Sequence, residues 1–286
     1  MIERLTLEVP DLAASRAFFD LLGYKSFATS CVSAQLCEAL GDVSLVAAPS
    51  ARILLRNNPI QALDLVETVN VQQAGFQTPG FAALELLVGG LDQLAVTVTK
   101  SNVAMLGAPS PLSFSEHIRA MQLLGPNNEL VYCTEVSGPI PGFTLPVLDH
   151  KAGECFVVIT AVSDIEESLQ FYSSLFGSEP PDVMQSRVVA MSHMQGLNSE
   201  AVYDIAALSM SARHYLELDQ WLPVPTEKSI DLGLKSSARI LCVSLTHESH
   251  HQIGDHAERE WQEQNGTPHC LVRGPDGELF EFVKMR

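Results

Sequence analysis

The chain has 286 residues, of which 46% are hydrophobic and 18% are charged, so it can bury a core and is not of the disordered class. Its formal net charge of −17 argues against nucleic acid as a partner, because affinity for phosphates comes largely from Lys and Arg. No apolar run is long enough to cross a membrane, nothing at the start resembles a signal peptide, and the six cysteines form no CxxC pair, so we expect a cytoplasmic protein with no membrane partner.

The first half of the chain alternates between strand and helix signals. Residues 3–9 alternate in polarity as a strand does, and Asp11 then fits the N-cap of a helix that stops at Gly23. Further strands are predicted at 43–48, 51–56, 81–88, 118–124 and 130–135, with a second helix over 91–106. Segment 137–146 contains three prolines and two glycines, which is typical of a linker.

The second half repeats this scheme. Strands are predicted at 156–162, 202–210, 213–219, 239–245 and 279–283, and helices at 164–176 and from residue 246 to about Gln264. The stretch 180–200 shows no regular pattern, and we expect an irregular loop there that could cover an entrance to a ligand site.

Two pairs of similar segments show that the chain is internally duplicated. Residues 9–23 resemble residues 162–177, and residues 125–132 resemble residues 274–281. The pairs occur in the same order at nearly the same separation, which is the signature of a repeated domain. We therefore expect two domains and a linker between them, with the boundaries 1–136, 137–150 and 151–286.

The repeated pattern is a strand, a helix that starts at V-x-D, an aromatic pair, Leu-Gly, and strands that close in G-P-D-G-x-L-x-E. This order resembles the vicinal oxygen chelate (VOC) superfamily, which includes glyoxalase I, extradiol dioxygenases and bleomycin-resistance proteins. The resemblance implies an α+β fold of four βαβββ modules, two per domain, whose mixed sheets curl into cups. In the dioxygenase layout the N-terminal domain is structural, which points to the C-terminal cup as the functional one.

Metal-dependent members of this superfamily place a His or Gln on the first strand of a module and a Glu on its last strand. Here the first-strand positions fall on Arg4 and Val157, and the closing position of the first domain falls on Tyr132. Two closing carboxylates, Glu217 and Glu281, remain, and carboxylates without imidazoles make a poor iron or zinc site. We therefore expect no cofactor; if a metal is bound, these two are its candidate ligands.

Glu217 and Glu281 are also the candidate catalytic residues. If they face each other across the C-terminal cup, burial and mutual repulsion raise the pKa of one of them into the range useful for proton transfer. The alternative is a structural carboxylate, paired with an arginine such as Arg239 or solvated at a strand end. The candidate substrate-binding residues are Tyr215, His193, Trp221, His269 and Arg239.

Residues 247–251 read as HExxH, the zinc-protease signature, but they lie where a strand is expected to give way to a helix. The longer form of that motif needs two residues between its Gly and its third His, and here only Asp255 separates Gly254 from His256. We therefore do not expect a metalloprotease.

Three functions stay open. The first is a metal-independent lyase or isomerase that acts on an apolar or aromatic metabolite in the C-terminal cup. The second is a binding protein that sequesters a small molecule, for which the charge of −17 would suit a cationic compound. The third is a metal-dependent dioxygenase or glyoxalase whose ligands lie in another register. In each case the partner is a small molecule, and the sequence leaves a homodimer open.

Overall fold

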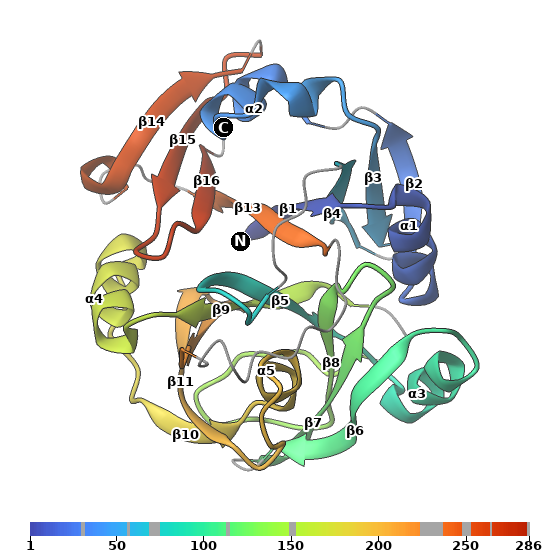
Figure 1. The fold of residues 1–286 in the computed structure, drawn as a ribbon. Helices are drawn as coiled ribbons and strands as arrows, with labels where there is room; N and C mark the ends of the chain where they lie inside the picture. The colour runs from blue at the N-terminus through green and yellow to red at the C-terminus, as the bar shows by residue number, and fades with distance from the viewer. Residues whose placement is uncertain are drawn as a thin grey trace.

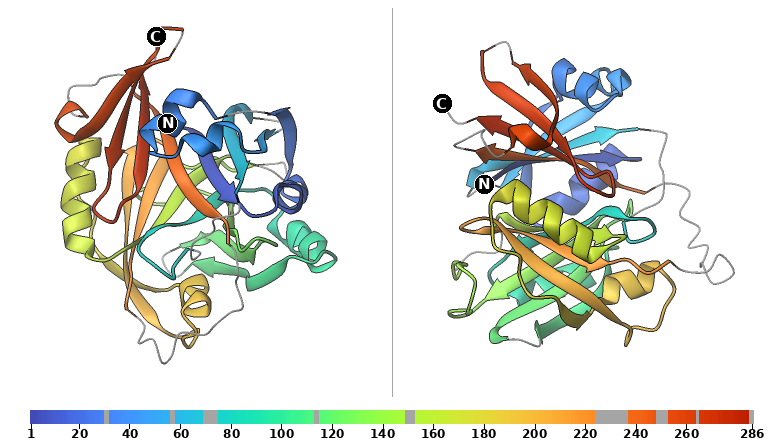
Figure 2. Two further views of the ribbon diagram at one scale, coloured as in Figure 1. Left: turned by 45° about the horizontal axis from the view of Figure 1, so that its top comes forward. Right: turned by 90° about the vertical axis from the view of Figure 1, so that its left-hand side faces the viewer.

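A computed structural model describes residues 1–29, 32–55, 58–68, 75–112, 115–148, 153–223, 237–247, 253–263 and 265–284. Within these residues the chain forms two eight-stranded mixed sheets that stack on one another, with helices at their flanks (Figures 1 and 2). The α+β fold class predicted from the sequence is confirmed.

Four modules follow one another along the chain. Module 1 consists of β1 (Ile2–Val9), α1 (Leu12–Leu21), β2 (Tyr24–Thr29), α2 (Ala34–Ala39), the 3-10 helix η1 (Val43–Val46), β3 (Ser50–Leu55) and β4 (Asn58–Glu67). Module 2 consists of β5 (Gly80–Leu87), α3 (Leu91–Thr99), β6 (Ala104–Leu112), β7 (Ser115–Leu124) and β8 (Leu130–Val136).

The remaining two modules repeat this order. Module 3 consists of β9 (Cys155–Val162), α4 (Ile165–Phe176), β10 (Met184–Arg187), α5 (Val189–Met194), β11 (Val202–Ser211) and β12 (His214–Gln220). Module 4 consists of β13 (Arg239–His247), the 3-10 helix η2 (Gly254–His256), β14 (Ala257–Gln262), β15 (Pro268–Arg273) and β16 (Leu279–Lys284). Among the described helices, none is both long and apolar enough to span a membrane.

The helices that open the duplicated segments begin where the sequence predicts. Asp11 caps α1 by accepting a hydrogen bond from the backbone N–H of Ala14 at 2.9 Å. Asp164 caps α4 in the same way, and α4 ends at Gly177 with φ of 61°, a conformation that favours glycine.

Some predicted elements differ from those observed. Residues 43–48 were expected to form a strand, but Asp42 caps a 3-10 helix there by accepting from Ser44 N–H at 3.0 Å. The helix predicted over 91–106 ends at Thr99, and the prolines that follow lie in the edge strand β6. The helix predicted to reach Gln264 is wrong for the described residues: Ala257–Gln262 form β14, where antiparallel pairing with β15 overrides the helix propensity. Residues 248–251 of the HExxH segment lie outside the described residues.

The two sheets combine the modules in an order that the repeat did not reveal. The strand order is β14-β15-β16-β13-β1-β4-β3-β2 in one sheet and β10-β11-β12-β9-β5-β8-β7-β6 in the other. Modules 1 and 4 therefore share one sheet, joined by the antiparallel pair β1–β13, and modules 2 and 3 share the other, joined by β5–β9.

This arrangement differs from the expectation that residues 1–136 and 151–286 would each build their own cup. The sequence repeat reflects the local structure of each module. Which strands join two modules into one sheet depends instead on contacts between segments far apart in the chain. Each half contributes one module to each sheet, so its two modules lie in different layers (Figure 1). The two halves are thus structurally interlocked.

Each half is nevertheless held together by its duplicated segments. The turn that precedes β8 lies against α1, where a side chain added at Gly125 would come within 2.3 Å of Glu129 and 2.9 Å of Phe18. The turn that precedes β16 lies against α4 in the same way, since a side chain at Gly274 would come within 2.0 Å of the Tyr172 hydroxyl oxygen. In each half, one duplicated segment forms a helix and the other forms the turn that packs against it.

A shared hydrophobic core lies between the two sheets. The first strand of each module contributes one buried aliphatic residue or more to it, including Leu5, Leu84, Val158 and Val243. The face of each sheet turned away from this core is concave. We call that face of the module 1 and 4 sheet cup A, with Arg4, Asp64, Ser244 and Glu281 on its central strands. We call the corresponding face of the module 2 and 3 sheet cup B, with Glu85, Tyr132, Val157 and Glu217 on its central strands.

Candidate functional site

The structure separates the predicted site residues into two groups. Glu281, His269 and Arg239 lie on the sheet of modules 1 and 4, whereas Tyr215, Glu217, Trp221 and His193 belong to module 3. The expectation that Glu217 and Glu281 face each other across one cup is therefore wrong, because β12 and β16 lie in different sheets. Each cup has to be considered by itself.

The floor of cup A is an ion-pair network centred on Arg4. Its Nη2 group donates a short hydrogen bond to Glu281, and its Nε lies 3.7 Å from an oxygen of Asp64. Arg52 forms a two-pronged contact with Asp64, with both N···O distances 2.7 Å. Both carboxylates have side chains only 1% exposed, so their two arginines provide the charge compensation that burial requires.

Glu281 accepts two further hydrogen bonds in cup A. Ser244 donates one, and His269 Nδ1 lies 2.8 Å from the other carboxylate oxygen, with its ring stacked on Trp261. Burial by itself would raise the pKa of Glu281, but Arg4, His269 and Ser244 together lower it to about 2. Glu281 is therefore held ionised, and a carboxylate so stabilised is a weak base.

These residues do not fit a divalent metal ion. The position that would bear a first-strand ligand carries the guanidinium of Arg4, which already places a positive charge between Asp64 and Glu281. A second cation there would be repelled by it. Within the described part of the chain, no group of three or more His, Cys, Asp or Glu side chains is arranged to hold a metal ion.

Cup B contains three carboxyl groups and no described basic partner for them. Asp219 follows Glu217 on the same face of β12, and Glu85 projects from β5, where it accepts a hydrogen bond from the Thr134 hydroxyl. Glu85 and Asp219 are 7% and 0% exposed, whereas Glu217 keeps a larger accessible fraction within the cup. Glu217 is thus the member of this group most available to a ligand.

Burial raises the pKa of all three carboxyls. The pKa of Glu85 rises to about 8 because of burial and the charge of Glu217. Burial also raises the pKa of Asp219 to about 8, although a hydrogen bond from Glu217 opposes the rise. The pKa of Glu217 is raised well above its usual value by burial and then by Asp219. The three groups therefore retain protons near neutral pH.

A proton shared by Glu217 and Asp219 accounts for the geometry of the pair. Among the described residues, neither oxygen of Asp219 has a hydrogen-bond donor as long as both groups are ionised. A proton on Glu217 supplies that donor, because its carboxyl lies within hydrogen-bonding reach of Asp219. Once the pair has lost one of its two protons, the two neighbouring carboxyls hold one proton between them, which is a recurrent arrangement for acid–base work.

Aromatic side chains surround this carboxyl group in cup B. Tyr132 and Tyr215 are both 6% exposed and belong to the apolar cluster that lines the cup. The Tyr215 hydroxyl accepts a hydrogen bond from Thr144 N–H at 3.2 Å, and its ring lies 5.0 Å from Phe143. The described part of the predicted linker therefore forms a wall of cup B rather than a free connection.

The other predicted binding residues have different roles. His193 is exposed on α5, which lies in the stretch expected to be irregular and packs into cup B through Met191 and Met194. Trp221 donates from its indole N–H to the backbone oxygen of Phe76 at 3.1 Å and closes the same apolar cluster. Arg239 pairs with Glu8 at 2.7 Å near the end of cup A.

Three residues of the candidate site were not among the predictions. Asp219 continues the alternation of Tyr215 and Glu217 along one strand, and that period of two could have identified it. Glu85 is the single charged residue in the apolar strand β5, and this feature could also have identified it as a candidate site residue. The Tyr132 hydroxyl was considered only as a missing metal ligand.

Comparisons with known proteins support the fold. No family model and no curated protein sequence matches the chain. Among solved structures, a glyoxalase I mutant from Zea mays matches with a TM-score of 0.64 and 14% identity, covering 99% of this chain and 93% of that chain. A putative dioxygenase from Bacillus subtilis matches with a TM-score of 0.62 and 10% identity, covering 99% of this chain and 84% of that chain.

These two matches extend over the whole chain rather than over one module pair. The chain therefore shares the fold of these two proteins, in agreement with the fold expected from the duplicated segments. Identities this low show a shared fold and leave the chemistry to be argued from the residues in the cups.

Proposed function

We propose that this chain is a metal-independent acid–base enzyme that acts on an apolar or aromatic small molecule in cup B. The observation that supports this most is the Glu217–Asp219 pair, in which a fully buried carboxyl lies beside a partly accessible one. Asp219 is the positioning residue that raises the pKa of Glu217, and Glu217 is the residue that contacts the substrate. Glu217 and Asp219 belong to module 3, whereas Glu85 and Tyr132 of the same cup belong to module 2.

The walls of cup B suit such a substrate. Tyr132 and Tyr215 offer aromatic faces, and Met191 and Met194 of α5 offer adaptable apolar surface. Among the described residues no partner accepts a hydrogen bond from the Tyr132 hydroxyl. Burial raises the pKa of Tyr132, so this hydroxyl keeps its proton and can donate to an oxygen on which negative charge develops.

The proton balance of the reaction follows from this arrangement. The pair, after losing one proton, removes a proton from a carbon of the substrate, and the electron pair of that C–H bond moves onto an adjacent carbonyl oxygen near Tyr132. In an isomerisation the same proton returns to another carbon, and in an elimination the electron pair expels a leaving group while the proton stays on the pair. Neither reaction class needs a metal or an oxidant.

The first test measures proton abstraction directly, whichever product the reaction forms. The full-length chain is incubated in D2O with a panel of apolar and aromatic carbonyl compounds, and deuterium incorporation is followed by mass spectrometry. We expect Glu217→Gln to slow exchange by about 100-fold or more, the usual contribution of a general acid–base group. Folding should be retained, because the substitution removes a titratable group from an unfavourable environment.

A matched control separates this effect from a general loss of charge. Glu200→Gln changes an exposed glutamate of the same module, which pairs with Arg187 at 2.9 Å on the surface, and exchange should be unaffected. Exchange that is equally fast in the Glu217→Gln protein would contradict the proposal. Exchange that disappears with a chelator would favour the metal-dependent alternative, and tight binding without any exchange would favour sequestration.

A further inference from the structure

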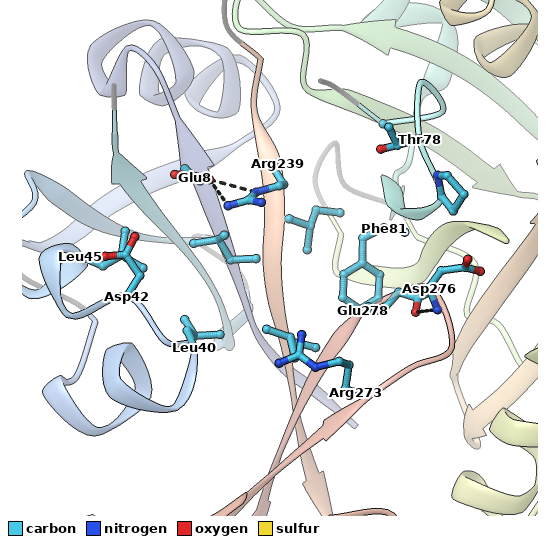
Figure 3. A pocket seen from close by; sticks show the side chains of 17 residues that line it. Glu8, Leu40, Asp42, Leu45, Thr78, Phe81, Arg239, Arg273, Asp276 and Glu278 are labelled. Carbon is cyan, nitrogen blue, oxygen red and sulfur yellow. Dashed lines mark hydrogen bonds and ion pairs between the residues drawn. The ribbon is translucent and has the colours of Figure 1, made fainter. Parts of the chain in front are cut away.

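A pocket of about 670 Å³ lies outside cup B, between the ends of the two sheets (Figure 3). Its walls come from the end of β1, the start of β13, the turn before β16, the start of β5 and the segment that contains α2 and η1. Pockets of this size accommodate metabolite-sized molecules. Because Glu217 does not line it, this pocket is separate from the proposed catalytic site.

One side of the pocket is apolar. Phe81, Leu241 and Leu279 line it, and the ring of Phe81 is fixed by an edge-to-face contact with Phe280 at 5.1 Å. An aliphatic or aromatic ligand body placed here would lose contact with water and gain contact with these side chains. The apolar wall therefore selects for a ligand that is at least partly hydrophobic.

Two arginines provide the positive charge of the pocket, and Figure 3 shows them on different sides of it. Arg239 is held by Glu8, with its Nε and Nη2 groups 3.0 and 2.7 Å from one carboxylate oxygen. Arg273 contacts Glu258 through Nε at 3.1 Å, and both of these side chains are nearly half exposed. Among the described residues, none accepts a hydrogen bond from the two terminal amino groups of Arg273.

The carboxylates of the pocket are engaged in local structure. Asp42 accepts from the backbone N–H and the hydroxyl of Ser44, at 3.0 and 2.5 Å. Asp276 accepts from Ser163 N–H at 2.9 Å, and Glu278 accepts from Asp276 N–H at 3.0 Å. Asp42 and Asp276 keep further acceptor capacity, and the donors left for a ligand are the terminal N–H groups of Arg273.

We propose that this pocket binds an organic anion whose apolar body rests on Phe81, Leu241 and Leu279 and whose acidic group is held by Arg273. The guanidinium presents paired N–H donors to a carboxylate, sulfonate or phosphate, and the exposed contact with Glu258 is weak enough to be exchanged for it. Arg239 lies at a second edge of the same pocket, where its charge is paired with that of Glu8.

The test uses three fluorescent probes on the full-length chain. They are the anionic 8-anilinonaphthalene-1-sulfonate, its uncharged relative N-phenyl-1-naphthylamine and the cationic thioflavin T. We expect Arg273→Gln to weaken binding of the sulfonate by about 10-fold to 100-fold, the value of a lost hydrogen-bonded charge contact, and to leave the uncharged probe nearly unchanged. Thioflavin T should bind more weakly than the sulfonate.

Two control variants make the result specific. Arg259→Gln removes an arginine of similar exposure that pairs with Glu38 and does not line the pocket, so affinity for the sulfonate should stay as in the wild type. Glu217→Gln should leave sulfonate binding unchanged, because cup B is a separate site. Sulfonate affinity that is insensitive to Arg273→Gln, or thioflavin T binding more tightly than the sulfonate, would overturn the proposal whether or not cup B is catalytic.

Discussion

Replacing Arg4 by methionine is expected to lower the free energy of unfolding by about 3 kcal/mol, because buried carboxylates then lose the cation between them. Arg4 contacts Glu281 directly and lies beside Asp64, and both carboxylates are almost completely buried. Chemical denaturation at neutral pH measures this loss. The loss should be large because Arg4 contributes most among the groups that lower the pKa of Glu281 to about 2, and without Arg4 burial disfavours that charge.

Two related variants show whether the loss comes from unpaired charge. Arg52→Met removes the more exposed arginine and leaves Arg4 beside Asp64, so we expect a smaller effect of about 1 kcal/mol. Replacing Arg4 and Glu281 together by methionine and leucine should recover part of the stability lost in Arg4→Met, since no unpaired charge is then left at Glu281. An Arg4→Met protein as stable as the wild type would contradict this account of cup A.

The second large effect is expected from pH. Glu85 and Asp219 have pKa values of about 8 in the folded chain, well above those of exposed carboxyls. The folded state therefore holds protons that the unfolded state has released, and stability must fall as pH rises toward 8. Each such proton contributes up to about 1.4 kcal/mol per pH unit to the slope.

The range between pH 6.5 and 8 isolates this contribution. His214, whose pKa burial lowers to about 4, produces the opposite slope, but only below the pKa of an unfolded histidine. Glu281 loses its contribution only in acid. Glu278, with a pKa raised by burial to about 7, adds to the fall in the lower part of the range.

The measurement compares wild type with a Glu85→Gln, Asp219→Asn double variant by denaturation at several pH values. We expect the double variant to lose the part of the slope above pH 7 that comes from Glu85 and Asp219, because its amides cannot ionise, and to keep the part that comes from Glu217. Glu200→Gln serves again as an exposed control and should keep the wild-type slope. A wild-type free energy of unfolding that is constant from pH 6.5 to 8 would show that these carboxyls are not protonated in cup B.

Most of the helices and strands could be predicted from the sequence. Asp11 and Asp164 cap their helices as predicted, and β1, β5, β8, β9 and β16 lie close to their expected positions. These elements are specified by side-chain period and capping chemistry, which act within a few residues. Strands β6 and β14 were missed because their residues are polar or rich in proline, and only pairing with a neighbouring strand stabilises them.

For the candidate site, the sequence identified individual residues but not the residues that contact them in the folded chain. Glu217, Tyr215 and Glu281 were singled out, and Arg4 was recognised at a position where metal-dependent relatives have a ligand. Their partners could not be found in this way: Arg4 and Glu281 are separated by 277 residues along the chain. A residue's charge state depends on such partners, so the opposite environments of Glu217 and Glu281 could not be inferred.

The sequence by itself determined the module, its repetition and the points where helices and strands begin, because these follow from patterns repeated within short segments. The tertiary structure decided which modules share a sheet and therefore which side chains share a cup. That choice depends on antiparallel pairing of β1 with β13 and of β5 with β9, in which either half could have satisfied the same hydrophobic pattern alone. By placing Arg4 close to Glu281 and Glu85 close to Glu217, this pairing made one cup an ion-pair network and the other a group of protonated carboxyls.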